Sequence, residues 1–267
     1  MFTRIALRIA VQEALRGQTL AGDNVLDSQI SALDLDADGS LRSDQDRPFL
    51  SVYTDGGAIG AGNGLGMLFG DPSVELVIEG GISATMGEID PTTGATIILG
   101  VGLPPTDAGM ELSLDVMMRQ VADALTDPAN EWAELARNLI TDISGIERSR
   151  VGQVTNGTRL AAHELRIRAG LVQDPIKGAN IAGTTYEPFL AALAASEKPH
   201  LLAVKTAIEQ ALAGDVADWE LVQRELGMSN AQSIALLGTR PMATDTGEPG
   251  TLADATIEVE GREGVDL

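Results

Sequence analysis

The amino-acid sequence predicts an α/β protein of the α+β kind, with a mixed or antiparallel sheet flanked by helices, loop insertions and a helical C-terminal part. Strand-like alternation, apolar residues at helical spacing and a core-forming composition support this prediction. Hydrophobic residues make up 44% of the 267-residue chain, but aromatic residues only 3%. The core should therefore be built mainly from Ala, Leu, Ile and Val.

The predicted strands are short runs rich in β-branched residues, bounded by glycine, proline or acidic residues. They cover residues 24–30, 48–54, 74–79 and 95–102, and a turn at residues 90–94 leads into the last of them. The strongest signal is residues 159–172, where Leu165, Ile167 and Ala169 alternate with Arg166 and Arg168. This alternation predicts a strand with one face toward the core and the other toward solvent or a partner.

The first predicted helix covers residues 3–16 and ends at Gly17. Its polar residues Arg8, Gln12 and Arg16 recur every four positions, which indicates an amphipathic helix and not a signal peptide. No stretch of the sequence approaches the roughly 20 apolar residues of a membrane span. We therefore expect a protein that is made in the cytoplasm and does not contact a membrane.

Two further helices are expected in the middle of the chain, where apolar residues are spaced three and four apart. The first begins near Ser113. The second has Asp127 as its expected N-cap and Pro128 in its first turn. Its apolar stripe extends from Trp132 to Ile143, so the helix is expected to include all of these residues.

The C-terminal part of the chain is predicted to be mainly helical. Helices are expected over residues 189–195, 199–213 and 219–226, followed by a short helix up to residue 238. Ser229 and Gln232 form a possible capping box for that last helix. We find no internal repeat and no clear linker, so residues 1–240 are interpreted as one domain and residues 241–267 as a C-terminal extension.

Two insertions interrupt the predicted domain. Residues 34–46 form an acidic loop, and residues 56–70, GGAIGAGNGLGMLFG, form a glycine-rich segment that we expect to be a mobile arm. The arm contains neither G-x-G-x-x-G nor G-x-x-x-x-G-K-[ST], and it has no Lys or Arg. Nucleotide binding by the arm is therefore not expected.

The chain is strongly acidic, with 18 Lys and Arg against 39 Asp and Glu and a net charge of −21. Such a surface repels nucleic acids and anionic membranes, and suits either a saline environment or a surface that DNA passes without binding. The chain has no cysteine, which excludes disulfides and thiolate chemistry. Its two histidines make a histidine-rich zinc site unexpected.

The sharpest local motif is a run of alternating carboxylates at Asp34, Asp36 and Asp38, followed by Gly39. It matches the start of a calcium loop, in which hard oxygen ligands converge on one ion and glycine permits a sharp turn. The twelfth position is Gln45, however, so the usual bidentate glutamate is missing. A solvated acidic turn is the favoured interpretation, and a calcium site at these three aspartates is the alternative.

Catalysis and specific DNA binding find little support in the sequence. Residues 219–238 imitate a helix-turn-helix, but Asn230 and Gln232 are accompanied by no positive charge between residues 229 and 237. His163 lies at a core-facing position of its predicted strand, with no G-x-S-x-G turn in the chain, and His200 is expected at an exposed helix start. We therefore expect a protein that is not an enzyme.

Several segments, in this order, resemble tail terminator proteins of long-tailed bacteriophages. They are RIALRIAVQEALRG, DNVLDSQI, RPFLSVYTD, MELSLDVMMRQVADAL and RLAAHELRIRAGLVQDP. The resemblance covers residues 2–240 in outline, and it consists of helix, strand and apolar patterns without an invariant site. Compared with the smaller family members this chain is longer, and the acidic loop, the glycine-rich segment and the C-terminal helices are the expected additions.

The resemblance implies a homo-oligomer, a hexameric ring at the head-proximal end of the tail tube in the neck of the virion. Such a ring stops polymerisation of the tail tube protein and joins the tail to head completion proteins, while DNA passes through without sequence-specific binding. It implies no catalytic residue and no cofactor. The alternatives are another neck or tail completion or minor tail protein, or a calcium-binding interaction module centred on Asp34, Asp36 and Asp38.

A calorimetric titration with calcium distinguishes a calcium loop from a solvated acidic turn. Because Gln45 cannot supply the bidentate carboxylate, we expect no saturable heat of calcium binding. A one-site isotherm that disappears in the Asp36→Asn variant would instead support the calcium module.

Overall fold

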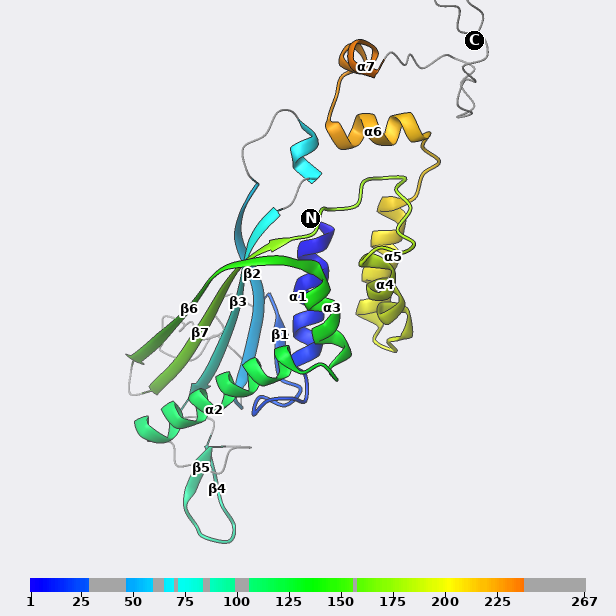
Figure 1. The fold of residues 1–267 in the computed structure, drawn as a ribbon. Helices are drawn as coiled ribbons and strands as arrows, with labels where there is room; N and C mark the ends of the chain where they lie inside the picture. Colours follow the sequence, from blue (N-terminus) through cyan, green and yellow to red (C-terminus); the bar gives the residue numbers. More distant parts are fainter. Residues whose placement is uncertain are drawn as a thin grey trace, which may run out of the picture.

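The computed structural model describes residues 1–28, 47–59, 65–69, 72–83, 87–98, 106–155 and 158–237. Within these ranges the chain forms a five-stranded mixed sheet, a separate two-stranded ribbon and seven α-helices, which confirms the predicted α+β class (Figure 1). The acidic loop at residues 34–46, with Asp34, Asp36 and Asp38, and the extension at residues 241–267 lie outside the described residues.

The main sheet has the strand order β1-β2-β3-β7-β6. Its strands are β1 (Val25–Asp27), β2 (Phe49–Ile59), β3 (Pro72–Ser83), β6 (Ile140–Thr155) and β7 (Thr158–Leu171). The short β1 runs parallel to β2, and every other pair is antiparallel, so the sheet is mixed. The sequence pattern predicts four of these strands but not β6.

The predicted strand at residues 95–102, of which residues 95–98 are described, does not join the main sheet over that described part. It is represented by β5 (Thr96–Ile98), which pairs with β4 (Gly87–Ile89) in a separate ribbon. The turn between them is confirmed, because the Asp90 carboxylate accepts hydrogen bonds from the Thr92 amide at 2.8 Å and the Thr93 hydroxyl at 2.7 Å. A side chain that closes its own turn favours a local hairpin over pairing with a distant strand.

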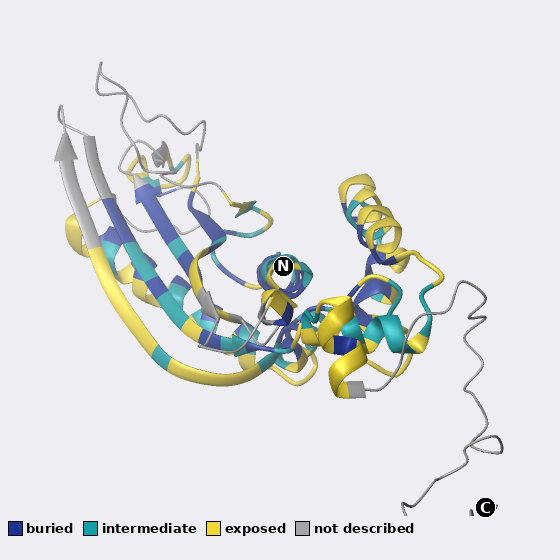
Figure 2. Ribbon diagram, turned by 90° about the horizontal axis from the view of Figure 1, so that it is seen from above, coloured by how far each residue is buried: buried dark blue, intermediate teal, exposed yellow. Residues whose placement is uncertain are grey.

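The helices form a layer on one face of the sheet and continue beyond it. They are α1 (Phe2–Leu15), α2 (Asp107–Thr126), α3 (Glu131–Leu139), α4 (Tyr186–Ala195), α5 (Pro199–Leu212), α6 (Asp218–Leu226) and α7 (Asn230–Leu237). Helices α1 and α2 share one apolar cluster with β2, β3 and β7. Both views place α4 and α5 on the far side of α1 from the sheet (Figures 1 and 2).

The start and the end of α3 both differ from the prediction. Asp127 ends α2 instead of starting α3, and the true N-cap is Asn130, whose side chain accepts from the Ala133 amide at 3.1 Å. The helix then stops at Leu139, and Ile140 begins β6 opposite Leu171. β-Branched residues after Leu139 favour an extended chain, and pairing with β7 decides in its favour.

Helix α1 is buried around nearly its whole circumference, which the amphipathic prediction did not anticipate. Leu7 is fully buried and the polar Gln12 is only 3% exposed. The Gln12 side chain donates to the Val25 carbonyl at 3.1 Å, and Arg8 forms an ion pair with Asp27 at 2.6 Å. The polar stripe of α1 therefore packs along β1, where it satisfies the backbone of that strand.

Residues 56–59 and 65–69 are the described parts of the glycine-rich segment predicted as a mobile arm, and both have regular structure. Its first residues continue β2 to Ile59, and residues 65–69 form a 3-10 turn that packs against α6. A Cβ at Gly66 or at Gly227 would overlap the backbone of the other segment, so this approach requires glycine on both sides. The glycines here permit close backbone packing, and not only flexibility.

Replacing Gly227 with alanine should detach residues 65–69 from the end of α6. The substitution adds left-handed backbone strain of about 1–2 kcal/mol and a clash with Gly66. We expect faster amide hydrogen exchange in residues 65–69 and 218–226, measured by mass spectrometry.

Gly22 provides the matched control, because it also has a positive φ but a Cβ there would meet nothing within 4 Å. Gly22→Ala should leave exchange in residues 65–69 unchanged. Equally faster exchange in residues 65–69 of both variants would show that the loss of a positive-φ glycine causes the effect. The close approach of the Gly66 and Gly227 backbones would then not be its cause.

Candidate functional site

The outer edge of the main sheet is the most exposed long element in the described part of the chain. Strand β6 is 16 residues long and stands at the end of the strand order, with β7 as its neighbour on one side. Most of the residues from 141 to 150 are exposed, and Figure 2 shows this strand exposed along much of its length. A long exposed edge is a template for pairing with another chain.

Two isoleucines on β6 continue the apolar face of the sheet beyond the area that the helices cover. Ile143 pairs with Ala169 and Ile146 with Ile167, so both lie on the face that carries the core. They are nevertheless 54% and 56% exposed. The core face of the sheet is therefore wider than its helical cover, and it leaves an apolar stripe at the edge.

The opposite face of the sheet carries a network of charged side chains across three strands. Arg166 on β7 contacts Glu164 at 2.6 Å and Glu75 on β3 at 3.2 Å. Arg168 on the same strand contacts Glu75 at 2.7 Å and Glu147 on β6 at 2.9 Å. Such cross-strand pairs fix the register of β3, β7 and β6. They also account for the arginines that the alternation at residues 159–172 predicted on this face.

The network and its surroundings shift several pKa values. The hydrogen bond from Arg168 lowers the pKa of the Glu75 carboxyl. Burial raises the pKa of Glu79, and the neighbouring Glu164 adds to this shift. Burial, with contributions from Glu79 and Glu164, raises the pKa of Tyr53 to about 12. Arg166 acts in the opposite sense on the pKa of Tyr53 but does not cancel the effects of burial and of these carboxylates.

His163 lies on the core face of β7, as its strand parity predicted, and it meets two carboxylates of α2. Its Nε2 atom is 3.2 Å from Glu111, and its Nδ1 atom is 3.7 Å from Asp115. Arg150 on β6 lies 2.8 Å from the other oxygen of Glu111. No sequence pattern predicted that these four residues meet, although the four-residue spacing of Glu111 and Asp115 places both on one side of a helix.

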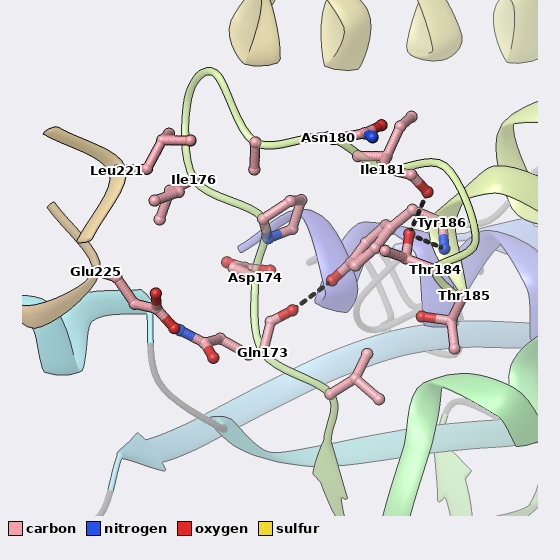
Figure 3. Close-up of a pocket in the computed structure, with 13 residues that line it drawn as sticks. Gln173, Asp174, Ile176, Asn180, Ile181, Thr184, Thr185, Tyr186, Leu221 and Glu225 are labelled. Carbon is pink, nitrogen blue, oxygen red and sulfur yellow. Dashed lines mark hydrogen bonds between the residues drawn. The ribbon is translucent and has the colours of Figure 1, made fainter. Parts of the chain in front are cut away.

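A cavity of about 520 Å³ lies where the chain leaves β7 and approaches α4 (Figure 3). At its wall the Tyr186 hydroxyl donates to the Gln173 carbonyl at 3.0 Å and also contacts the Thr3 hydroxyl. Asp174, 7% exposed, accepts from the Thr3 amide at 2.8 Å and the Thr3 hydroxyl at 2.6 Å. These polar groups satisfy one another and join α1 to the chain after β7, so we assign them a structural role.

The remaining residues singled out in the sequence have local roles or lie outside the described residues. Asp34, Asp36 and Asp38 belong to the latter group. The predicted capping box is confirmed. The Gln232 side-chain oxygen accepts from the Ser229 backbone amide at 2.9 Å, and the Gln232 backbone amide donates to the Ser229 hydroxyl at 3.3 Å. Asn230 accepts from the Gln223 side chain at 2.7 Å. The polar residues of the helix-turn-helix look-alike thus make contacts with one another, at the start of α7 and between α6 and α7.

Comparison with known proteins does not assign this chain to a family. No family model matches the sequence, and no curated protein matches it either. Among the described residues, none of the helices has the length and apolar character needed to cross a bilayer.

The two tyrosines of the chain should resist ionisation while it is folded. Burial raises the pKa of both Tyr53 and Tyr186 to about 12, against about 10 for a free phenol. Between these values the folded state binds more protons than the unfolded state, so stability should fall as pH rises from about 10 to about 12.

Ultraviolet absorbance of tyrosinate, followed with circular dichroism, measures this effect. We expect tyrosine ionisation to coincide with unfolding, and the Tyr53→Phe and Tyr186→Phe variants separate the two contributions. Ionisation near pH 10 of a chain that keeps its folded spectrum would contradict the burial of these phenols.

Proposed function

We propose that this chain is a virion structural protein that forms a ring at the head-proximal end of a phage tail tube. The observation that carries the proposal is the exposed edge strand β6 with the apolar stripe of Ile143 and Ile146. The sequence resemblance to tail terminators gives this edge its proposed context, and the α+β architecture agrees with what that resemblance implies.

A second copy of the chain is the proposed occupant of the β6 edge. Arg148 lies exposed on this strand beside Arg150, which is already paired with Glu111, in a chain whose net charge is −21. Basic side chains on one surface of an acidic protein can pair with the acidic surface of the next copy, and the apolar stripe gains stability when it is covered. Contact between two different surfaces of like subunits generates a closed ring when the rotation closes.

The proposed mechanism is geometric. A ring seated on the last layer of the tail tube occupies the surface on which another layer would assemble, and it offers a different surface to head completion proteins. The excess of acidic groups suits a protein along which DNA moves without binding, because phosphates are repelled. No chemical step and no cofactor are needed for this function.

Another neck or tail component is the second candidate, because the same exposed edge suits assembly elsewhere on the particle. Labelling of the chain in assembled particles discriminates the two, since a terminator lies between the tube and the head. A calcium-binding interaction module at Asp34, Asp36 and Asp38 stays a third proposal, tested by the titration described above.

Placing lysine at both exposed isoleucines should prevent ring formation. The double variant Ile143→Lys/Ile146→Lys puts two charges into the proposed interface, where a buried unpaired charge is strongly unfavourable. We expect the parent chain to form a closed ring of about six subunits under assembly conditions, as the family resemblance implies, and the variant to stay monomeric. Light scattering and negative-stain imaging measure this difference.

Leu202→Lys on α5 is the matched control, because Leu202 is also partly exposed (39%) but belongs to a helix away from the β6 edge. It should form rings as the parent does. The functional readout is the length of tail tubes polymerised in the presence of each protein. A parent chain that stays monomeric and has no affinity for tube ends would reject the proposed function.

A further inference from the structure

We propose that Glu111, Asp115 and His163 form a binding site for one divalent transition-metal ion of the zinc class. The three residues bring two carboxylates and an imidazole from α2 and β7 to one place. One potential ligand atom from each lies within 4.8 Å of the other two. The proposal concerns α2 and the sheet beneath it, and it does not depend on the proposed ring.

The three side chains lie within a small rearrangement of a coordination sphere, because one potential ligand atom from each is within 4.8 Å of the other two. Metal–ligand distances of about 2.0–2.2 Å place neighbouring ligand atoms about 3–3.5 Å apart. The Glu111 oxygen is 3.2 Å from His163 Nε2, and the Asp115 oxygen is 3.7 Å from His163 Nδ1. The two carboxylates thus face opposite nitrogens of the ring, and one ion can bind only one of these nitrogens. Glu111 already faces Nε2, so the mostly exposed Asp115 side chain (65%) has to rotate from Nδ1 toward that side to complete the site.

The surroundings of Glu111 support coordination through a single oxygen. One oxygen faces His163, and the other is buried and accepts no hydrogen bond, although the Arg150 guanidinium lies 2.8 Å away as an ion pair. A carboxylate whose second oxygen is held by a cation is a common outer-shell arrangement around metals, because it orients the ligating oxygen. His163 is only 15% exposed, so its ring is already held in place by packing.

A hollow of about 290 Å³ opens beside the three residues and gives an ion access and room for water ligands. Asp115 and His163 line it, together with Ser149, Arg148 and Arg119. Arg119 is paired with Asp123 at 2.9 Å, and Arg150 with Glu111, so two of the nearby positive charges are compensated. Three protein ligands with water in the remaining position are typical of accessible zinc sites.

The ligand types select the class of ion. An imidazole nitrogen suits zinc, nickel, copper and iron, whereas calcium and magnesium prefer oxygen ligands throughout. The proposed ion would join α2 to β7 through side chains that lie 52 positions apart in sequence. This is a different site from the acidic triplet at Asp34, Asp36 and Asp38, which has no histidine.

The test is a titration of the full, tag-free chain with zinc chloride. Binding is measured by calorimetry, and the histidine rings are monitored by nitrogen NMR. The chain has two histidines, so the spectrum contains an internal control. We expect one zinc per chain, a shift of the His163 ring nitrogens and none of those of His200. A zinc isotherm without a selective shift of His163 would overturn the proposal, as would the absence of one-per-chain binding.

Variants identify the ligands independently. Asp115→Asn, Glu111→Gln and His163→Gln should each weaken zinc binding at least about tenfold. Glu209→Gln, at a carboxylate of α5 that is paired with Lys205 at 2.6 Å and lies away from the site, is the matched control and should bind as the parent does. Asp115 is exposed, so its variant should fold normally even if the others do not. Unchanged zinc affinity in Asp115→Asn would show that these residues form only a polar contact between α2 and β7.

Discussion

The burial of α1 is the constraint on which the rest of the described structure depends. A helix that is apolar on most sides needs cover on most sides, and here the sheet, α2, α3 and the C-terminal helices supply it. Its few polar groups receive partners from every neighbour: Gln12 bonds to β1, Glu13 pairs with Lys198 next to α5, and the Ala14 carbonyl accepts from Asn130. The helix thus joins both ends of the described chain into one core.

The position of the helices also explains which part of the core face of the sheet stays uncovered. Helices α1 and α2 cover the middle of the core face, but β6 lies beyond them, and Ile143 and Ile146 stay exposed on the same face as buried Ala169. The opposite face is closed by charge pairs such as Arg168 with Glu75 and Glu147, so it gains little from a partner. We therefore propose assembly at the edge of the sheet, where exposed apolar surface coincides with a strand that, among the described residues, is paired on one side only.

The contact between α2 and β7 is held by two kinds of interaction. Met117 and Leu114 are fully buried against the sheet, whereas one end of the contact depends on Glu111, Asp115 and His163. Glu111 and His163 are partly buried there (30% and 15% exposed) and need partners, because desolvation without compensation is costly, whereas Asp115 stays mostly exposed. Arg150 supplies part of this compensation, and a bound cation would supply the rest. Because Arg150 belongs to β6, the charge balance around Glu111 depends on where β6 lies.

The amino-acid sequence determines those features of the fold that depend on local patterns. They are the alternation of β7, the apolar stripe of α5 from Leu201 to Leu212, the capping box at Ser229 and the aliphatic composition of the core. These features depend on neighbours within a few positions, so a single chain segment reveals them. Tertiary structure alone decided that α3 stops at Leu139, because β7 offers the next residues a strand to pair with. It also decided that Gly66 meets Gly227 and that His163 meets Glu111, since such contacts depend on how distant segments pack and not on the residues beside them.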